Sequence, residues 1–186
     1  MRAAAIPWLI AVASWAGPAL AAAQPADQDI SVQVRKDHTA YEIDFEFTVA
    51  ATIEQTWNVL SDFDHMAQIL SNVDSSRVVS RDGNRITVAQ TSHGKIGLIH
   101  VSVDGLREID LTPPTELRSH LIRGDLRASD FVTELHGEGT VTRVSGHGKI
   151  VVAPWVGLAL GAERVAAQTR QQYQELRSEI LRRKAL

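Results

Sequence analysis

The sequence predicts an α+β domain in which a curved antiparallel sheet of about seven strands packs against one long C-terminal helix. Two patterns predict it. Apolar residues alternate with polar ones from Tyr41 to Val49, which is the period of a strand with one buried face. An apolar stripe then recurs at spacings of three and four over residues 158–180, as in one continuous helix. Because a one-sided sheet must cover its apolar face, this helix is expected to lie across it.

The other strands follow from alternating segments separated by turn residues. Asp82-Gly83-Asn84 predicts a tight hairpin turn, and Gly137 with Gly139 predicts another. Gly146 and Gly148 suggest a bulge or a close approach of the backbone to another group. The expected strands are 30–35, 41–49, 76–81, 85–92, 96–110, 115–123, 128–137 and 139–152, the first being an extra strand before the domain proper.

Two short helices are expected directly after the strand at 41–49. Thr52 and Gln55 have the spacing of a capping box, which begins a helix. Ser61 or Asp62 is the cap candidate for a second helix, and we interpret Asp62 and Asp64 as helix caps rather than catalytic carboxylates. The apolar positions of the two helices are Ile53, Trp57, Leu60, Met66, Ile69 and Leu70.

Residues 1–23 have the pattern of a cleaved signal peptide. Arg2 supplies a positive start, an apolar run follows, and Ala21-Ala22-Ala23 offers a cleavage site ahead of Gln24. An uncleaved anchor is the alternative, although the apolar run is shorter than the ~20 residues that span a bilayer. We therefore expect a periplasmic or secreted protein with a lead and extra strand at 24–40 and one domain at 41–184.

The composition excludes several classes of function. The chain has 19 basic and 22 acidic residues, and without a clustered basic surface nucleic-acid binding is not expected. Basic residues do gather at the end of the last helix, where they complement the helix dipole; a membrane-surface patch with transient contact is the alternative. These residues are Arg177, Arg182, Arg183 and Lys184.

No pattern for a cofactor, a metal or a nucleophile is present. The seven histidines are scattered without zinc-ligand spacing, there is no cysteine, and no G-x-S-x-G or phosphate-binding loop occurs. The acid–base candidates are His100, Ser102, Glu134 and Arg143. In a closed pocket desolvation could tune such groups for proton transfer, but a solvent-facing polar row is the expected alternative.

One motif carries a family resemblance. Trp57-x-Val59-Leu60-x-Asp62-Phe63-Asp64 after an apolar strand resembles the START-related, helix-grip (SRPBCC) superfamily, and is most similar to its bacterial polyketide-cyclase and coenzyme-Q-binding branch. The similarity continues through Ser76–Arg85, Pro113-Pro114, Arg123–Leu126 and the final helix, and it covers nearly all of 41–183.

The resemblance implies a cavity between sheet and helix that holds an apolar molecule. The residues alone also allow close helix–sheet packing without a cavity. The expected function is an exported carrier of a lipid, quinone or isoprenoid, without an obligate protein partner; a cyclase- or dehydratase-like enzyme and a protein with a vestigial cavity are the alternatives. The residues expected to line the pocket are Trp57, Leu60, Met66, Ile69, Phe131, Trp155, Leu158, Ala162 and Val165.

Overall fold

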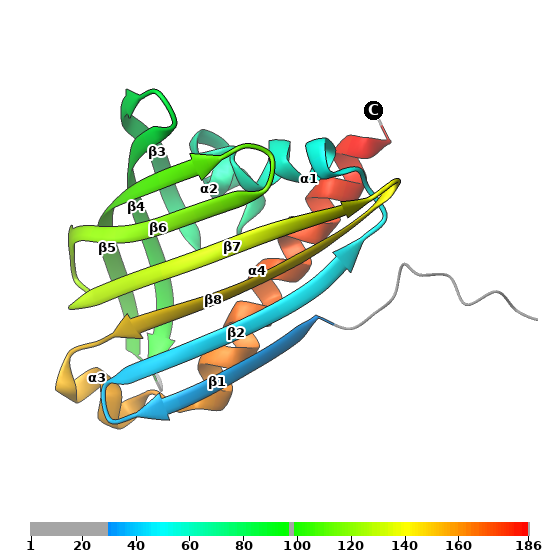
Figure 1. The fold of residues 1–186 in the computed structure, drawn as a ribbon. Coiled ribbons are helices and arrows are strands. Elements are labelled where there is room, and N and C mark those ends of the chain that lie inside the picture. The colour runs from blue at the N-terminus through cyan, green and yellow to red at the C-terminus, as the bar shows by residue number, and fades with distance from the viewer. Residues whose placement is uncertain (1–29, 97–98, 186) are drawn as a thin grey trace, which may run out of the picture.

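An eight-stranded antiparallel sheet curves around one long helix, which confirms the predicted α+β class; the eighth strand, β1, is the extra strand expected before the domain (Figure 1). The computed structural model describes residues 30–96 and 99–185, so the expected signal peptide lies outside the described residues. In sequence order the strands are β1 (Ser31–Asp37), β2 (Ala40–Val49), β3 (Val73–Asp82), β4 (Arg85–Ile96), β5 (Ile99–Thr112), β6 (Glu116–Gly124), β7 (Ala128–Glu138) and β8 (Val141–Val151). Their order across the sheet is β1-β2-β8-β7-β6-β5-β4-β3.

The helices lie on one side of this sheet, and we call the sheet face toward them the inner face (Figure 1). They are α1 (Ile53–Leu60), the short 3-10 turn η2 (Phe63–His65), α2 (Met66–Ile69), α3 (Pro154–Ala159) and α4 (Ala162–Lys184). Helix α4 packs mainly against β1, β2 and α1. It therefore covers the β1–β2 side of the sheet more closely than the β3–β6 side.

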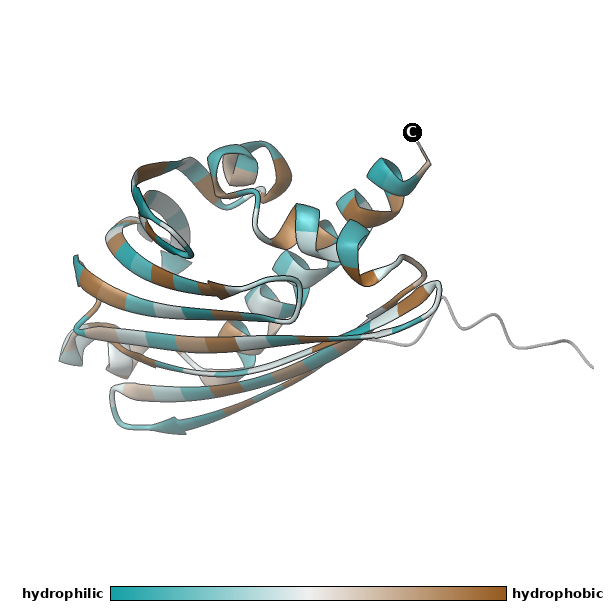
Figure 2. Ribbon diagram, turned by 45° about the horizontal axis from the view of Figure 1, so that its top comes forward, coloured by the Kyte–Doolittle hydropathy of each residue, from teal (hydrophilic) through white to brown (hydrophobic). Residues whose placement is uncertain are grey.

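The alternating pattern of β2 places its apolar side chains under α4. Tyr41, Ile43, Phe45, Phe47 and Val49 are at most 4% exposed, and hydropathy alternates visibly along the strands (Figure 2). The ring of Tyr173 from α4 stacks on Phe45 at 4.0 Å between centroids and lies 5.5 Å from Phe47. Burial raises the pKa of the Tyr173 phenol, which therefore stays neutral at physiological pH.

The prediction of one continuous C-terminal helix is wrong at its N-terminal end. Leu160 and Gly161 have extended backbones and separate α3 from α4. The Tyr41 hydroxyl donates to the Leu160 carbonyl oxygen at 2.6 Å, and Lys36 Nζ donates to the carbonyl oxygens of Gly157 and Leu160 at 2.6 and 2.9 Å. Side chains of β1 and β2 thus satisfy carbonyl groups at the break, so the interruption costs few hydrogen bonds.

The structure confirms the predicted start of α1 and the predicted turn between β3 and β4. Thr52 and Gln55 form the predicted capping box. Strand β3 ends at Asp82 and β4 begins at Arg85, with Gly83 at a φ of 57° that favours glycine. The predicted tight turn between β7 and β8 is also present, with Gly139 at a φ of 62°.

The interpretation of Asp62 and Asp64 as helix caps is wrong. Neither cap residue of η2 or α2 makes a side-chain cap hydrogen bond. Asp62 instead accepts from His65 at 2.6 Å and from Arg183 at 2.8 Å, and Asp64 accepts from the backbone N–H of Val78 at 2.8 Å. Burial opposes ionisation of Asp62, but these two side-chain hydrogen bonds outweigh it and lower its pKa. The carboxylates therefore tie the loop after α1 to α4 and β3.

Candidate ligand site on the inner face of the sheet

The inner face carries a set of polar side chains away from the part that α4 covers. We call this set the inner polar cluster; its members are Ser76, Gln90, Arg107, Ser119, Ser129 and Thr133. Strand register places them on the face that Phe45 and Ile43 occupy in β2. Ser129 is fully buried, whereas the other five keep part of their surface accessible. An accessible region thus lies within the curve of the sheet, over β3 to β7.

Phe131 lies at one edge of this region, on the inner face of β7. Its cross-strand partners are Ser119 on β6 and Gly148 on β8. A Cβ atom at Gly148 would overlap the Phe131 ring, and one at Gly146 would overlap the Phe45 ring. The sequence suggested either a bulge or a close approach of the backbone at these glycines, and the structure shows the close approach. Their missing side chains leave room for the two rings on the inner face.

Arg107 is the charged member of the cluster. It lies on β5 between Val88 on β4 and Leu121 on β6, both of which are buried. Its Nη1 atom donates to Ser129 Oγ at 2.9 Å, reaching across β6 to β7. Burial lowers the pKa of the guanidinium, and the charge of Asp130 opposes this effect without outweighing it. A mostly desolvated cation with a neutral partner is therefore built into the inner face.

The sequence analysis missed Arg107, although a signal for it exists. Val101 and Val103 alternate with His100 and Ser102, and the same period of two continues through Arg107, Ile109 and Leu111. An arginine in the apolar register of a strand indicates a cation facing the interior.

A pocket of about 470 Å³ opens between α4 and the end of β4. Gln172 Nε2 donates to Asn72 Oδ1 at 3.1 Å along one side of it, and Gly94 approaches Gln168. Its lining consists of Ser71, Asn72, His93, Gly94, Lys95, Arg164, Ala167, Gln168, Gln171 and Gln172. This pocket lies where the end of β4 meets α4, and no member of the inner polar cluster lines it.

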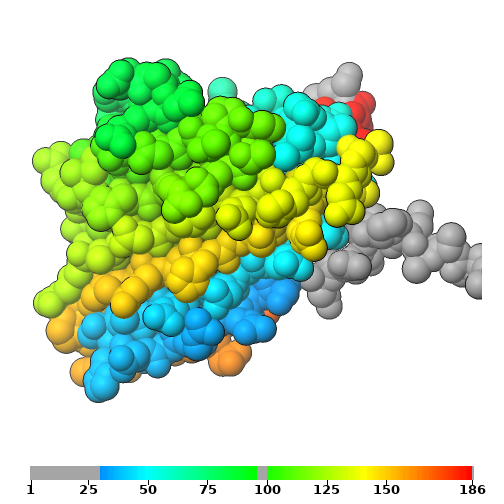
Figure 3. Space-filling view, viewed as in Figure 1, coloured from blue at the N-terminus to red at the C-terminus, as the bar shows by residue number. Residues whose placement is uncertain are grey.

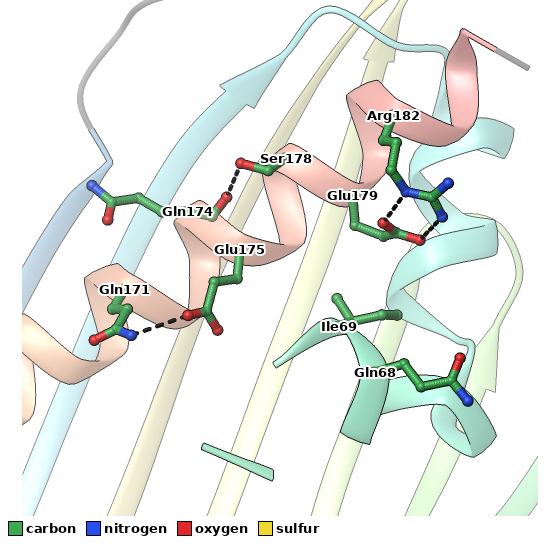
Figure 4. Close-up of a pocket in the computed structure, with 8 residues that line it drawn as sticks. All are labelled: Gln68, Ile69, Gln171, Gln174, Glu175, Ser178, Glu179 and Arg182. Carbon is green, nitrogen blue, oxygen red and sulfur yellow. Dashed lines mark hydrogen bonds and ion pairs between the residues drawn. The ribbon is translucent and has the colours of Figure 1, made fainter. Parts of the chain in front are cut away.

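A second pocket, of about 430 Å³, lies in the groove between α2 and α4 (Figure 4). Several of its polar side chains are engaged with each other: Gln171 donates to Glu175 at 3.0 Å, and Arg182 donates to both carboxylate oxygens of Glu179 at 2.7 Å. Ile69 lines the same groove. Because these groups satisfy one another, the groove offers fewer free donors and acceptors than the inner face.

The nine residues expected to line a pocket are spread over several environments. The buried ones belong to the hydrophobic core: Trp57, Leu60, Met66 and Val165. Phe131 lies on the inner face, Ile69 in the α2–α4 groove, and Ala162 at the partly exposed start of α4. Trp155 and Leu158, on α3, are 59% and 89% exposed. The structure therefore brings Phe131, but not Trp155 or Leu158, next to the inner polar cluster.

The four acid–base candidates lie on the outer face of the sheet, which faces the viewer in Figure 3 where β6, β7, β8 and β2 form it. His100 pairs with Lys95 and Ser102 with His93 across β4 and β5, and Glu134 and Arg143 likewise project away from α4. All four are exposed. The expectation of a solvent-facing polar row is confirmed. Within residues 30–96 and 99–185 no three histidine, aspartate or glutamate side chains are grouped as metal ligands would be.

Comparison with known families gives one match. Residues 40–180 match the model of a family described as polyketide cyclase / dehydrase and lipid transport. The chain belongs to this family. A search of curated proteins finds no match. Among the helices of the described part of the chain, none is long and apolar enough to cross a membrane.

Solved structures share the fold at low sequence identity. A protein from Thermus thermophilus is 21% identical with a TM-score of 0.66, covering 75% of this chain and 97% of its own. The Streptomyces Zhui aromatase/cyclase is 14% identical with a TM-score of 0.63, covering 77% and 95%. A STAR-related lipid transfer protein from Xanthomonas axonopodis is 11% identical with a TM-score of 0.61, covering 82% and 99%. These similarities show a shared fold, and with the family match over residues 40–180 they agree with the resemblance of the sequence to the START/SRPBCC superfamily.

Proposed function

We propose that the protein is an exported carrier of an apolar small molecule, which binds within the curve of the sheet, on the part of the inner face beside α4. The observation that carries this proposal is the accessible region on the inner face, around Phe131 and the inner polar cluster. A binding site of this kind is mostly apolar, with a few polar groups that fix orientation. The family match and the lipid transfer protein of similar fold support the same reading.

A cyclase- or dehydratase-like activity is the alternative, supported by the family description and by the fold of the aromatase/cyclase. Such an enzyme needs a proton donor or acceptor within hydrogen-bonding reach of its substrate. The four candidates from the sequence project from the opposite face of the sheet. We therefore favour carriage over catalysis.

The test combines ligand identification with a variant that fills the site. Native mass spectrometry and lipid extraction of the purified protein should yield a bound apolar molecule, and delipidated protein should take up a fluorescent fatty acid. Ser119, between Ile109 and Phe131 on the inner face, is the position to fill. Ser119→Phe should weaken probe uptake at least about tenfold, whereas Ser102→Phe on the outer face should not.

Wild-type protein that carries no apolar molecule and takes up no probe would overturn the carrier proposal. Equal uptake by the two phenylalanine variants, both folded by circular dichroism, would place the site elsewhere. For the proposed export, the intact mass of protein recovered from the periplasm or medium should correspond to a chain that starts at or near Gln24. Retention of residues 1–23 in that material would contradict cleavage.

A further inference from the structure

Arg107 has more hydrogen-bond donors than partners. A guanidinium has five N–H donors, and Arg107 uses one of them, for Ser129 Oγ at 2.9 Å, among the interactions of the described residues. No described carboxylate lies within ion-pair distance of it. Asp130, whose charge acts on the pKa of Arg107, projects from the outer face of β7 and pairs there with His120. The positive charge of Arg107 is therefore not neutralised by the protein around it.

A guanidinium in this position lowers the stability of the fold unless an anion binds beside it. A desolvated charge without a counter-charge destabilises a fold, and a lysine could relieve this by losing its proton, whereas an arginine keeps its charge at neutral pH. Another cation of the inner face, Lys36 on the distant strand β1, has a different role because it binds the carbonyl oxygens of Gly157 and Leu160. An anion beside Arg107 would offset the cost that the protein leaves uncompensated.

The surroundings of Arg107 indicate which class of anion would bind beside it. A single guanidinium with a neutral hydroxyl beside it neutralises one negative charge, and its planar fork matches a carboxylate. A phosphate monoester, with a charge of about −1.5 to −2, would need a second cation. The neighbours Val88 and Leu121 are apolar, and the inner face continues through Ile109 towards Phe131.

We propose that the ligand is a monocarboxylic acid with an apolar body, its carboxylate bound by Arg107 and its body lying along the inner face towards Phe131. This inference rests on the carrier function proposed above and narrows it. Neutral quinones and isoprenoids, which lack the anionic group, would leave Arg107 unpaired and bind more weakly.

Paired ligands and paired variants test the inference. Delipidated mature protein is titrated calorimetrically at pH 8 with decanoic acid, decan-1-ol and decyl phosphate, each below its micelle concentration. The acid should bind about ten- to a hundredfold more tightly than the alcohol, the range expected for hydrogen bonds to a charged group. It should also bind more tightly than the phosphate. Arg107→Met should remove the preference for the acid, while Arg143→Met, an exposed arginine on the outer face, should keep it.

A second measurement does not depend on ligand. Because Arg107→Met removes a largely desolvated charge that has no counter-charge, the ligand-free variant should melt at the same temperature as wild type or higher. Equal affinity for acid and alcohol would overturn the carboxylate assignment and leave the carrier function standing, as would tightest binding of the phosphate. An unchanged preference in Arg107→Met would remove Arg107 from the site. Failure of all three probes to bind would overturn both the assignment and the carrier function.

Discussion

Trp57 and Trp155 form a matched pair that tests the arrangement of the core. Trp57 is 9% exposed on α1 and belongs to the hydrophobic core, whereas Trp155 is 59% exposed on α3. A buried tryptophan removes about 150–250 Å² from water, which at about 25 cal/mol/Å² corresponds to about 4–6 kcal/mol. Alanine retains a small part of this, so Trp57→Ala should reduce the free energy of unfolding by about 3–5 kcal/mol.

The assay is urea unfolding followed by far-ultraviolet circular dichroism, since both variants remove a fluorophore. With a urea m-value of about 2 kcal/mol/M, the midpoint of Trp57→Ala should fall by about 2 M. Trp155→Ala should stay within about 0.5 kcal/mol of wild type, as is usual for surface substitutions. If the two variants unfold at the same urea concentration, the burial of Trp57 between α1 and the rest of the core is wrong.

Three further predictions concern other contacts. Gly148→Ala should cost about 1–3 kcal/mol by urea unfolding because its Cβ overlaps the Phe131 ring, and less in a Phe131→Leu background; equal losses would contradict the contact. The Arg182 hydrogen bond, opposed by burial, holds the pKa of Glu179 at about 2 instead of 4.5. This carboxylate therefore stabilises the fold above pH 4.5 and loses that effect as the pH falls towards 2. Glu179→Gln should flatten the pH dependence of the melting temperature there, and an unchanged slope would refute the pairing. Tyr41→Phe, which removes the hydrogen bond to the Leu160 carbonyl oxygen, should lower the free energy of unfolding by about 0.5–1.5 kcal/mol. It should also speed amide hydrogen exchange at the α3–α4 break, and exchange as slow as in wild type would show that this hydrogen bond does not stabilise the break.

The sequence predicted the elements whose causes are local. The alternation in β2, the Thr52–Gln55 capping box and the Gly83 turn each depend on residues a few positions apart. The break between α3 and α4 could not be predicted in this way. Apolar spacing continues across it from Leu158 to Ala162, and the groups that hold it open come from β1 and β2, more than a hundred positions earlier.

The candidate site was predicted in outline but not in its chemistry. The family resemblance implied a site between sheet and helix, and Phe131 does lie on the inner face. The pairing of Arg107 with Ser129 depends on the register of β5, β6 and β7. That register is a property of the assembled sheet, so periodicity within one strand can suggest which face Arg107 occupies but not which residue it contacts.

The strand order also determines when the sheet can close during folding. Strand β2 pairs with β8, which joins Ala40 to Val151 across nearly the whole domain. The free edge of β2 in the β1–β2 hairpin therefore has no partner strand until β8, the last strand of the sheet, has left the ribosome. Contacts between such distant segments carry a large loop-closure entropy and slow the folding of a chain. The N-terminal hairpin must stay unpaired and protected from aggregation for most of the time that synthesis takes.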